Sequence, residues 1–516
     1  MTDLLLGIPQ NAGLATRLKP YSYNDSTSAF AQDTWLISPR LTLNYGLRWD
    51  YTTPRINNDC QVANFDPTAN GGQGGIVVPA TGASGAQACS LVNPWHRAFA
   101  PRLGLAYRIT DKLVFRGGAG LFYQGIDRQG SESLLELNPP YYLDTRAAKS
   151  VTVMPTLFLQ NGFPAGLLTP YALDNYARLD QLSMIRAADP NLRPAYVENY
   201  SAGFQIPINQ NLLADFGWVG NFAHHEWTLG NLNQKQISTT GGVTTVTAPY
   251  PNFPQVEWKS PIGNLNYNSL QAKLEQRLSN GLNFLLNYTW SKAISDYVTN
   301  LEVGAGAGNG RTFNQNYYNR KADKALMVND QPQRISLSTS YAIPSGKGYH
   351  AFNSGLQSQI LGNWQLNGIY MLASGEALGI VSPSDTSQTG VFKVGVTRAN
   401  CIAKPKFSSG GKVSEWFDTT AFALPATYTF GTCGNSPGIR SARTDNVNFS
   451  VFKDFIPAKS DRFQVQFRTE FFNILNHPQF APPATAGLTV TNATFGSVTS
   501  LLQSPRQIQF ALKLFY

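Results

Sequence analysis

Charged residues are scarce in this sequence of 516 residues: they make up 14% of it, against roughly 25% in soluble domains. Long apolar runs are also missing, because no stretch reaches the ~18 apolar residues of a membrane-spanning helix. This absence excludes a helical membrane protein. It does not exclude a membrane β-barrel, whose alternating apolar and polar residues average to the near-neutral mean hydropathy of −0.21 found here.

Dense clusters of basic residues are absent too, although the formal net charge is +9. The basic residues stand singly along the chain, which argues against a nucleic-acid partner. Many occupy positions that we expect to face inward, where they would form a polar wall: Arg48, Arg102, Arg108, Arg116, Lys273, Arg277, Arg462 and Arg468.

Cysteine is rare, with four residues at positions 60, 89, 401 and 433. They form no C-x-x-C motif, and no histidine pair completes a metal-binding set, so we expect neither a metal nor another cofactor. The four fall as two pairs, each inside one expected loop. Disulfides Cys60–Cys89 and Cys401–Cys433, formed in an oxidising compartment, are the natural interpretation. Four free buried thiols are the alternative.

The first nine residues, MTDLLLGIP, lack the basic segment and the apolar length of a secretory signal peptide. An exported barrel would carry such a peptide. The sequence therefore predicts that this chain is a fragment of a longer protein or the product of a truncated reading frame.

Apolar residues alternate with polar ones in thirteen segments, the pattern of strands with two different faces. In 281–293, for example, Leu282, Phe284 and Leu286 oppose Asn283 and Asn287. The segments are long enough to cross a bilayer as tilted strands. They are 28–37, 39–53, 97–109, 112–124, 196–207, 211–224, 266–278, 281–293, 333–343, 363–376, 443–455, 462–475 and 504–516.

The last segment has the clearest alternation. Its apolar face consists of Ile508, Phe510, Leu512, Leu514 and Tyr516, and polar residues fill most of the positions between them. An apolar face with an aromatic residue at the chain end is typical of a lipid-facing barrel strand. We therefore expect this segment to be the barrel-closing C-terminal strand, although a soluble edge strand could carry the same pattern.

The connections between these segments alternate between short turns and long loops. Tight turns are expected near Ser38, Asp111, Gln210 and Asn280, and long loops over 54–96, 125–195, 225–265, 294–332 and 377–442. Outer-membrane barrels have this arrangement, with short turns on one rim and long loops on the other. The loops are rich in Gly, Pro, Asn, Ser and Thr, so we expect them to have no core of their own.

No residue is expected to perform covalent chemistry. Residues 434–438 read Gly-Asn-Ser-Pro-Gly and match the nucleophile-elbow pattern. However, the residue after the serine must donate its N–H to an oxyanion hole, and Pro437 has none. The sequence therefore predicts that the protein is not an enzyme.

Several segments resemble the barrel of TonB-dependent outer-membrane transporters, especially the Oar-like branch. These segments are 30–35 with 39–49, 449–455, 468–480, 495–496 and 504–510. The resemblance is strongest over 28–53 and 443–516. In the middle of the chain, the spacing of the strands is more similar than the residues themselves.

The resemblance implies an all-β fold: an antiparallel up-and-down transmembrane β-barrel of about 22 strands with an N-terminal plug and a TonB box. This sequence would supply about 13–14 of those strands and no plug. Residues 1–27 would be a loop or the remnant of an upstream extracellular loop, and 28–516 the C-terminal part of the barrel domain. The odd strand count prevents antiparallel closure of the thirteen segments on themselves.

The function that the resemblance implies is TonB-linked uptake of an unidentified solute across the outer membrane of a Gram-negative-type bacterium. The implied partners are outer-membrane lipid, the barrel assembly machinery, the solute, and TonB only through the missing N-terminal region. Two alternatives stay open: a surface adhesion or structural protein whose extracellular loops bind a ligand, and a passive porin.

Overall fold

The structure is a computed structural model of the chain. It describes residues 7, 11–17, 19–82, 88–124, 135–148, 158–163, 184–297, 314–327, 329–346, 351–352, 355–391, 397–405, 407–455 and 464–516.

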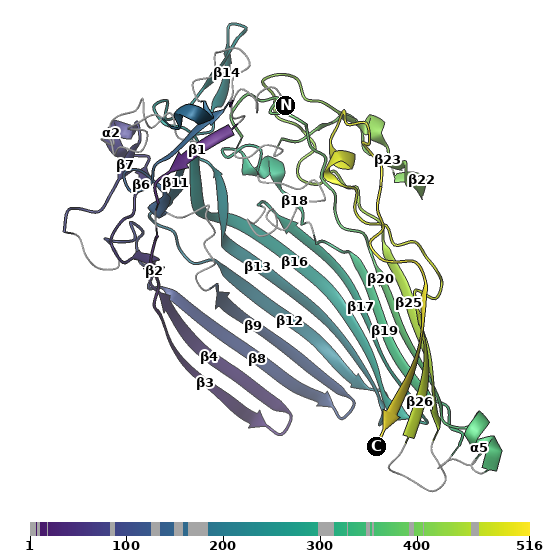
Figure 1. The fold of residues 1–516 in the computed structure, drawn as a ribbon. Coiled ribbons are helices and arrows are strands. Elements are labelled where there is room, and N and C mark those ends of the chain that lie inside the picture. Colours follow the sequence, from purple (N-terminus) through teal and green to yellow (C-terminus); the bar gives the residue numbers. More distant parts are fainter. Residues whose placement is uncertain are drawn as a thin grey trace.

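One large antiparallel sheet dominates the described residues (Figure 1). Each of the thirteen segments that the sequence predicts as strands is a strand of this sheet, and neighbours in the sequence are neighbours in the sheet. The strands are β3 (Ser26–Ser38), β4 (Leu41–Thr52), β8 (Ala98–Thr110), β9 (Leu113–Tyr123), β12 (Tyr196–Pro207), β13 (Leu212–Asn231), β16 (Val256–Ser279), β17 (Leu282–Ser295), β19 (Gln333–Ala342), β20 (Trp364–Ala373), β25 (Thr444–Phe455), β26 (Gln464–Phe472) and β27 (Gln507–Phe515).

Two strands are longer than the alternation predicts. β13 continues to Asn231 and β16 begins at Val256, so the two strands remain paired well beyond the expected boundaries. The register shifts near His224 and Glu226, where a bulge changes which side chains share a face. Because the bulge interrupts the alternation of apolar and polar residues, a simple period-two pattern does not reveal that the strands continue beyond it.

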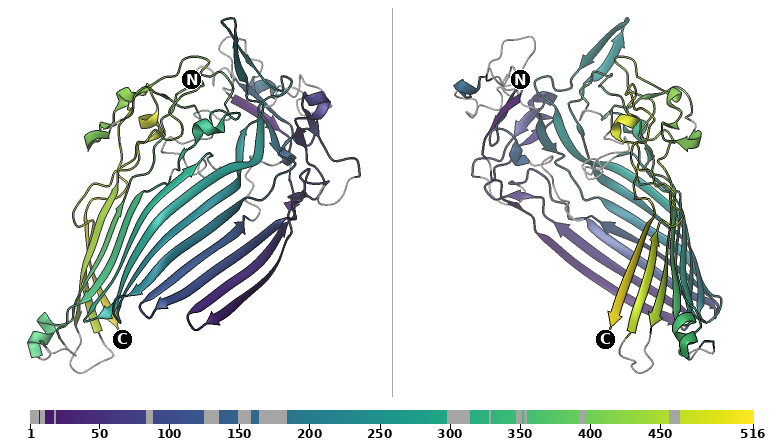
Figure 2. Two further views of the ribbon diagram at one scale, coloured as in Figure 1. Left: turned by 180° about the vertical axis from the view of Figure 1, so that it is seen from behind. Right: turned by 45° about the vertical axis from the view of Figure 1, so that its right-hand side comes forward.

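Within the described residues the sheet does not close. β3 forms one edge and β27 the other, and no pairing joins them (Figure 2). Thirteen consecutive antiparallel strands place the first and the last in the same direction, so these two edges cannot form an antiparallel seam with each other. The sheet is curved, as expected for part of a barrel wall.

The connections are divided between two rims, as the sequence predicts. The turns after β3, β8, β12 and β16 lie at the lower rim of Figure 1, together with α5 (Gly355–Leu361). In the turn after β16, Asn280 and Gly281 both have positive φ values, 50° and 81°. This is the backbone that a tight hairpin with the natural strand twist requires.

The long loops gather at the opposite rim and carry short elements of their own. None of the helices in the described part of the chain is long and apolar enough to cross a membrane. The short strand pairs are β1 (Asn11–Ala15) with β10 (Asp144–Ala148), β2 (Ser22–Tyr23) with β5 (Ile56–Asn57), β6 (Asn64–Asp66) with β7 (Gly75–Val77), β14 (Gln236–Thr240) with β15 (Val243–Thr247), β21 (Asn400–Cys401) with β24 (Phe422–Ala423), and β22 (Phe407–Lys412) with β23 (Glu415–Phe417); β11 (Ile185–Ala188) joins β16, β18 (Ala325–Leu326) joins β17, and α2 (Ala69–Gly72) is a single helical turn.

Candidate functional site

The sheet has one polar face and one apolar face, and the strand register shows which residues share each face. One row of the polar face runs across five strands through Asn44, Gly104, Gly118, Ser201 and Val219, which are direct cross-strand neighbours. Directly opposed residues project to the same side of a sheet. Because several residues of this row have a small side chain or none, they leave space over the centre of the polar face.

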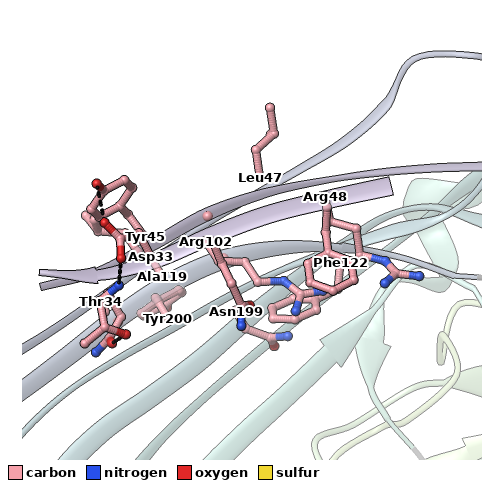
Figure 3. Close-up of a pocket in the computed structure, with 18 of the residues that line it drawn as sticks. Asp33, Thr34, Tyr45, Leu47, Arg48, Arg102, Ala119, Phe122, Asn199 and Tyr200 are labelled. Carbon is pink, nitrogen blue, oxygen red and sulfur yellow. Dashed lines mark hydrogen bonds between the residues drawn. The ribbon is translucent and has the colours of Figure 1, made fainter. Parts of the chain in front are cut away.

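A hollow of about 770 Å³ lies over this part of the polar face. Figure 3 shows Arg48, Arg102, Phe122 and Asn199 projecting to one side of the strands, whereas Leu47 points to the other. The inward direction expected for Arg48 and Arg102 is thus the direction that the structure gives them.

The two arginines are held in different ways. The Arg48 guanidinium donates to Asp50 Oδ1 and to Ser28 Oγ, in each case over 2.8 Å. The guanidinium carbon of Arg102 lies 4.5 Å from the centroid of the Phe122 ring. A guanidinium fork suits planar or anionic oxygen groups, so this hollow is chemically suited to a polar or acidic solute.

Strands β3 and β4, which line part of the hollow, approach each other closely at Gly46. A Cβ atom at this position would lie 2.9 Å from the Cβ atom of Gln32 on the neighbouring strand β3. A larger residue would therefore push the two strands apart or force Gln32 to move. Glycine at inward positions of successive strands is the signal in the sequence for this hollow, and the alternation of apolar and polar residues alone does not reveal it.

A second hollow of about 360 Å³ lies on the same face over β12, β13, β16 and β17. Its wall includes Lys273, whose Nζ atom lies 3.0 Å from Asp215 Oδ2 and 3.1 Å from Glu275 Oε2. Arg116 also lines it. The expected inward residue Arg462 lies outside the described residues.

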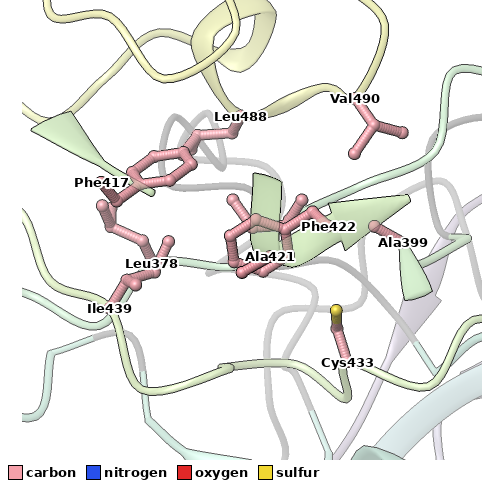
Figure 4. Close-up of a cluster of buried hydrophobic side chains, with 10 residues drawn as sticks. Leu378, Ala399, Phe417, Ala421, Phe422, Cys433, Ile439, Leu488 and Val490 are labelled. Carbon is pink, nitrogen blue, oxygen red and sulfur yellow. The ribbon is translucent and has the colours of Figure 1, made fainter. Parts of the chain in front are cut away.

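Above the polar face, the long loops fold together into what we call the loop cap: the described parts of 53–97, 184–195, 232–255, 314–332, 374–443 and 473–506. Here the structure corrects the expectation that the loops have no core. Phe417, Leu378, Ile380 and Leu488 are fully buried in a cluster built from two loops (Figure 4). The loops are long enough to bring apolar residues together despite their glycine-rich composition, and burial of those residues stabilises the arrangement.

Buried polar groups join three loops of the cap. Gln315 donates from its backbone N to Asp323 Oδ2 over 2.9 Å and from Nε2 to the Gly431 oxygen over 2.7 Å. Its side-chain oxygen accepts from the backbone N of Arg398 over 3.2 Å, and its backbone oxygen accepts from Gln234 Nε2 over 2.8 Å. Three of these four hydrogen bonds cross between loops, and they hold the loops after β13, β17 and β20 together.

An ion pair crosses the same interface. Arg398 Nε lies 3.6 Å from Asp323 Oδ1, and both side chains are fully buried. Burial lowers the pKa of Arg398, and the neighbouring Asp323 carboxylate opposes that shift. No spacing in the sequence identifies this pair, because its members belong to different loops.

Disulfides join Cys60 to Cys89 and Cys401 to Cys433, with sequence separations of 29 and 32 residues. Each closes a segment within one loop. Cys433 belongs to the buried cluster of Figure 4. In the described residues no group of three or more His, Cys, Asp or Glu side chains is placed to hold a metal ion.

The chain matches the family model described as "Outer membrane beta barrel domain" over residues 1–509. The chain belongs to this family. This membership confirms the expected fold class and indicates that the barrel wall lies in the outer membrane. A search among curated proteins finds no match.

Similar solved structures include three receptors or transporters. The siderophore receptor PirA from Acinetobacter baumannii is 9% identical, with a TM-score of 0.44, and the match covers 95% of this chain and 46% of that one. The outer membrane transporter YddB from Escherichia coli is 10% identical, with a TM-score of 0.41 and coverages of 96% and 54%. The copper transporter OprC is 10% identical, with a TM-score of 0.39 and coverages of 96% and 48%. This chain thus spans about half the length of these proteins, and likenesses of this size identify no shared substrate.

In this barrel wall, the C-terminal strand β27 exposes the apolar row that the sequence singles out. Ile508, Phe510, Leu512 and Leu514 are 52%, 67%, 66% and 55% exposed, and Tyr516 follows the strand fully exposed. The register sets these side chains on the same face as Phe471, Phe467 and Val465 of β26. Among the described residues β27 pairs only with β26, so the structure shows an edge at this strand and no closing seam.

Proposed function

We propose that this chain forms part of the wall of an outer-membrane transporter that takes up an unidentified solute by TonB-linked active transport. The observation that supports this most strongly is the polar inner face, with the arginine-lined hollow lying beneath the folded loop cap. A solute bound by loops and then by Arg48 and Arg102 would follow a continuous polar path. That TonB provides the energy for this uptake is inferred from the sequence resemblance to TonB-dependent transporters.

The proposal includes a division of the chain. The C-terminal part of the barrel domain extends from β3 to residue 516, and β3 begins at Ser26, two residues before the expected boundary at 28. The residues before β3 are a loop or the remnant of an upstream extracellular loop. In support, residues 11–15 pair with β10 and residues 22–23 with β5, both at the long-loop rim. Closing the sheet with antiparallel pairs requires an odd number of further strands, because β3 and β27 run in the same direction. Unpaired edge groups are costly in hydrocarbon, which favours such completion.

The proposed partners follow from the same assignment. The apolar face contacts outer-membrane lipid of a Gram-negative-type bacterium, and the barrel assembly machinery inserts the strands. TonB acts through the region that precedes the barrel, and not through the strands described above. The proposed role requires no covalent chemistry, so no catalytic residue is assigned.

The test measures solute accumulation in the periplasm of cells that produce the complete gene product. Cells with the wild-type protein and with the double variant Arg48→Ala, Arg102→Ala are compared, with and without a protonophore. We expect one or more solutes to accumulate only with the wild-type protein and only in energised cells. Arg40→Ala at the opposite rim is the control, because it removes an exposed arginine outside the hollow.

Two results would contradict this function. Accumulation that persists with the protonophore, together with steady open conductance in planar bilayers, would show a passive porin. Absence of accumulation for every solute, with retained binding of a surface partner by the loop cap, would show an adhesive or structural protein.

A further inference from the structure

A band of aromatic rings lies on the apolar side of the sheet near the long-loop ends of β4, β9 and β12, together with His96 before β8 and His224 of β13. The ring centroids of Tyr51 and His96 lie 4.4 Å apart, those of Tyr123 and Tyr196 5.7 Å, and those of Tyr196 and His224 5.2 Å. Tyrosine rings gather where a membrane meets water. This band therefore marks the depth of the lipid headgroups.

A hollow of about 530 Å³ lies at the same level, between segments 93–97 and 191–193. Its walls carry Arg97, Arg193 and His96, and none of the described residues that line it is acidic. Within the described part of the chain, neither arginine forms an ion pair with an acidic side chain. The carboxylate of nearby Asp189 accepts a hydrogen bond from the backbone N of Asn191 over 2.8 Å.

The walls of the hollow are fixed by hydrogen bonds from neighbouring strands. Trp49 Nε1 donates to the His96 oxygen over 2.8 Å, and Trp227 Nε1 donates to the Arg193 oxygen over the same distance. The two segments are joined by Asn93 Nδ2, which donates to Asn191 Oδ1 over 3.0 Å. The backbone that carries both arginines is therefore held in place before any ligand arrives.

A tryptophan ring covers one side. The Arg193 guanidinium carbon lies 5.6 Å from the centroid of the Trp95 ring. The combination of two guanidinium groups, an imidazole and an indole suits a phosphorylated sugar, since guanidinium binds phosphate bidentately and sugar rings pack on aromatic faces.

We propose that this hollow binds the phosphorylated headgroup of an outer-leaflet lipid. The headgroup phosphate lies between Arg97 and Arg193, and the acyl chains run down the apolar face beside the tyrosine band. The inference goes beyond the transport function and does not depend on it. It requires only that the apolar face is embedded in the membrane, and it supplies a specific anchor at the outer rim.

The test titrates the purified complete protein in detergent micelles with three probes: a bis-phosphorylated glucosamine lipid, the same lipid without phosphates, and inorganic phosphate. Tryptophan fluorescence reports binding, because Trp95 lines the hollow. Arg97→Gln with Arg193→Gln is the test variant. Arg40→Gln with Lys112→Gln is the matched control, which removes the same charge from exposed positions at the opposite rim.

We expect the phosphorylated lipid to bind the wild-type and control proteins equally, and the test variant about 30-fold more weakly, since each basic residue near a lipid surface contributes about 1 kcal/mol. Equal binding of the phosphorylated and dephosphorylated lipids by the wild-type protein would overturn the proposal without any variant. Inorganic phosphate that binds as tightly as the lipid would overturn it too, by showing a site for a free anion. Equal losses in the test and control variants would show an unspecific charge effect.

Discussion

Replacement of Arg398 by Met should loosen the loop cap while the barrel wall stays folded. The substitution leaves the fully buried Asp323 carboxylate without the guanidinium that lies 3.6 Å away. At an effective dielectric constant of ~20, a charge pair at that distance is worth about 4–5 kcal/mol. Breaking a buried pair on one side usually costs about 3–5 kcal/mol. We therefore expect the opening free energy of the cap to fall by about 3–5 kcal/mol.

Hydrogen exchange of the backbone amides in 374–443 measures this loss directly, and amides of β16 and β17 serve as the internal reference. The double variant Arg398→Met, Asp323→Asn is the decisive control. The side-chain amide introduced by Asp323→Asn would keep an oxygen that accepts from the Gln315 N–H but would carry no charge. We expect the second substitution to recover most of the protection. If the double variant exchanges as fast as the single one, an uncompensated buried charge is not the cause of the loss.

Three further outcomes are expected. Cys401→Ser with Cys433→Ser should lower the stability of the cap by roughly 3–4 kcal/mol on the chain-entropy model, and peptide masses before and after reduction should show both intraloop disulfides in the wild type. Burial raises the pKa of Tyr317 and of Tyr318 to about 12, so an absorbance titration should show that these two tyrosines ionise at higher pH than free tyrosine. Their contribution to the stability of the cap should be fully present below about pH 10 and should be lost between about pH 10 and 12, because the unfolded chain loses these protons first. Lys273→Met should lower the free energy of unfolding by under about 1 kcal/mol, because Lys273 is partly exposed where it pairs with Asp215 and Glu275, and denaturant unfolding of the wild-type and variant proteins measures the difference.

The strands were predictable from the sequence because the two faces of each strand meet different surroundings, and this difference appears as alternation of apolar and polar residues within the strand itself. In β17, Leu282, Phe284 and Leu286 meet lipid while Asn283 and Asn287 face the lumen, so a period of two is visible in a few residues. The turn at Asn280 and Gly281 is equally local. Family membership and the strand register agree with the fold class expected from these patterns.

The loop cap was not predictable in this way. Leu378 and Leu488 are more than a hundred residues apart in the sequence and are buried in the same cluster. Gln315 bonds to residues of two other loops, and no period or short motif encodes such contacts. The loop sequences are rich in glycine and asparagine, and this composition hid the apolar residues that form the core.

Residue-by-residue alternation between a lipid face and a lumen face is the property of the sheet on which the fold and the proposed function both depend. Single cysteines placed at 335–340 of β19 in the complete protein test it most directly. According to the register, Ile335, Leu337 and Thr339 face lipid, and Ser336, Ser338 and Ser340 face the lumen. We predict that a membrane-impermeant maleimide labels the three lumen positions and spares the three lipid positions, whereas a lipid-soluble thiol reagent shows the reverse. Equal labelling at all six positions, or alternation of the opposite sign, would contradict the account.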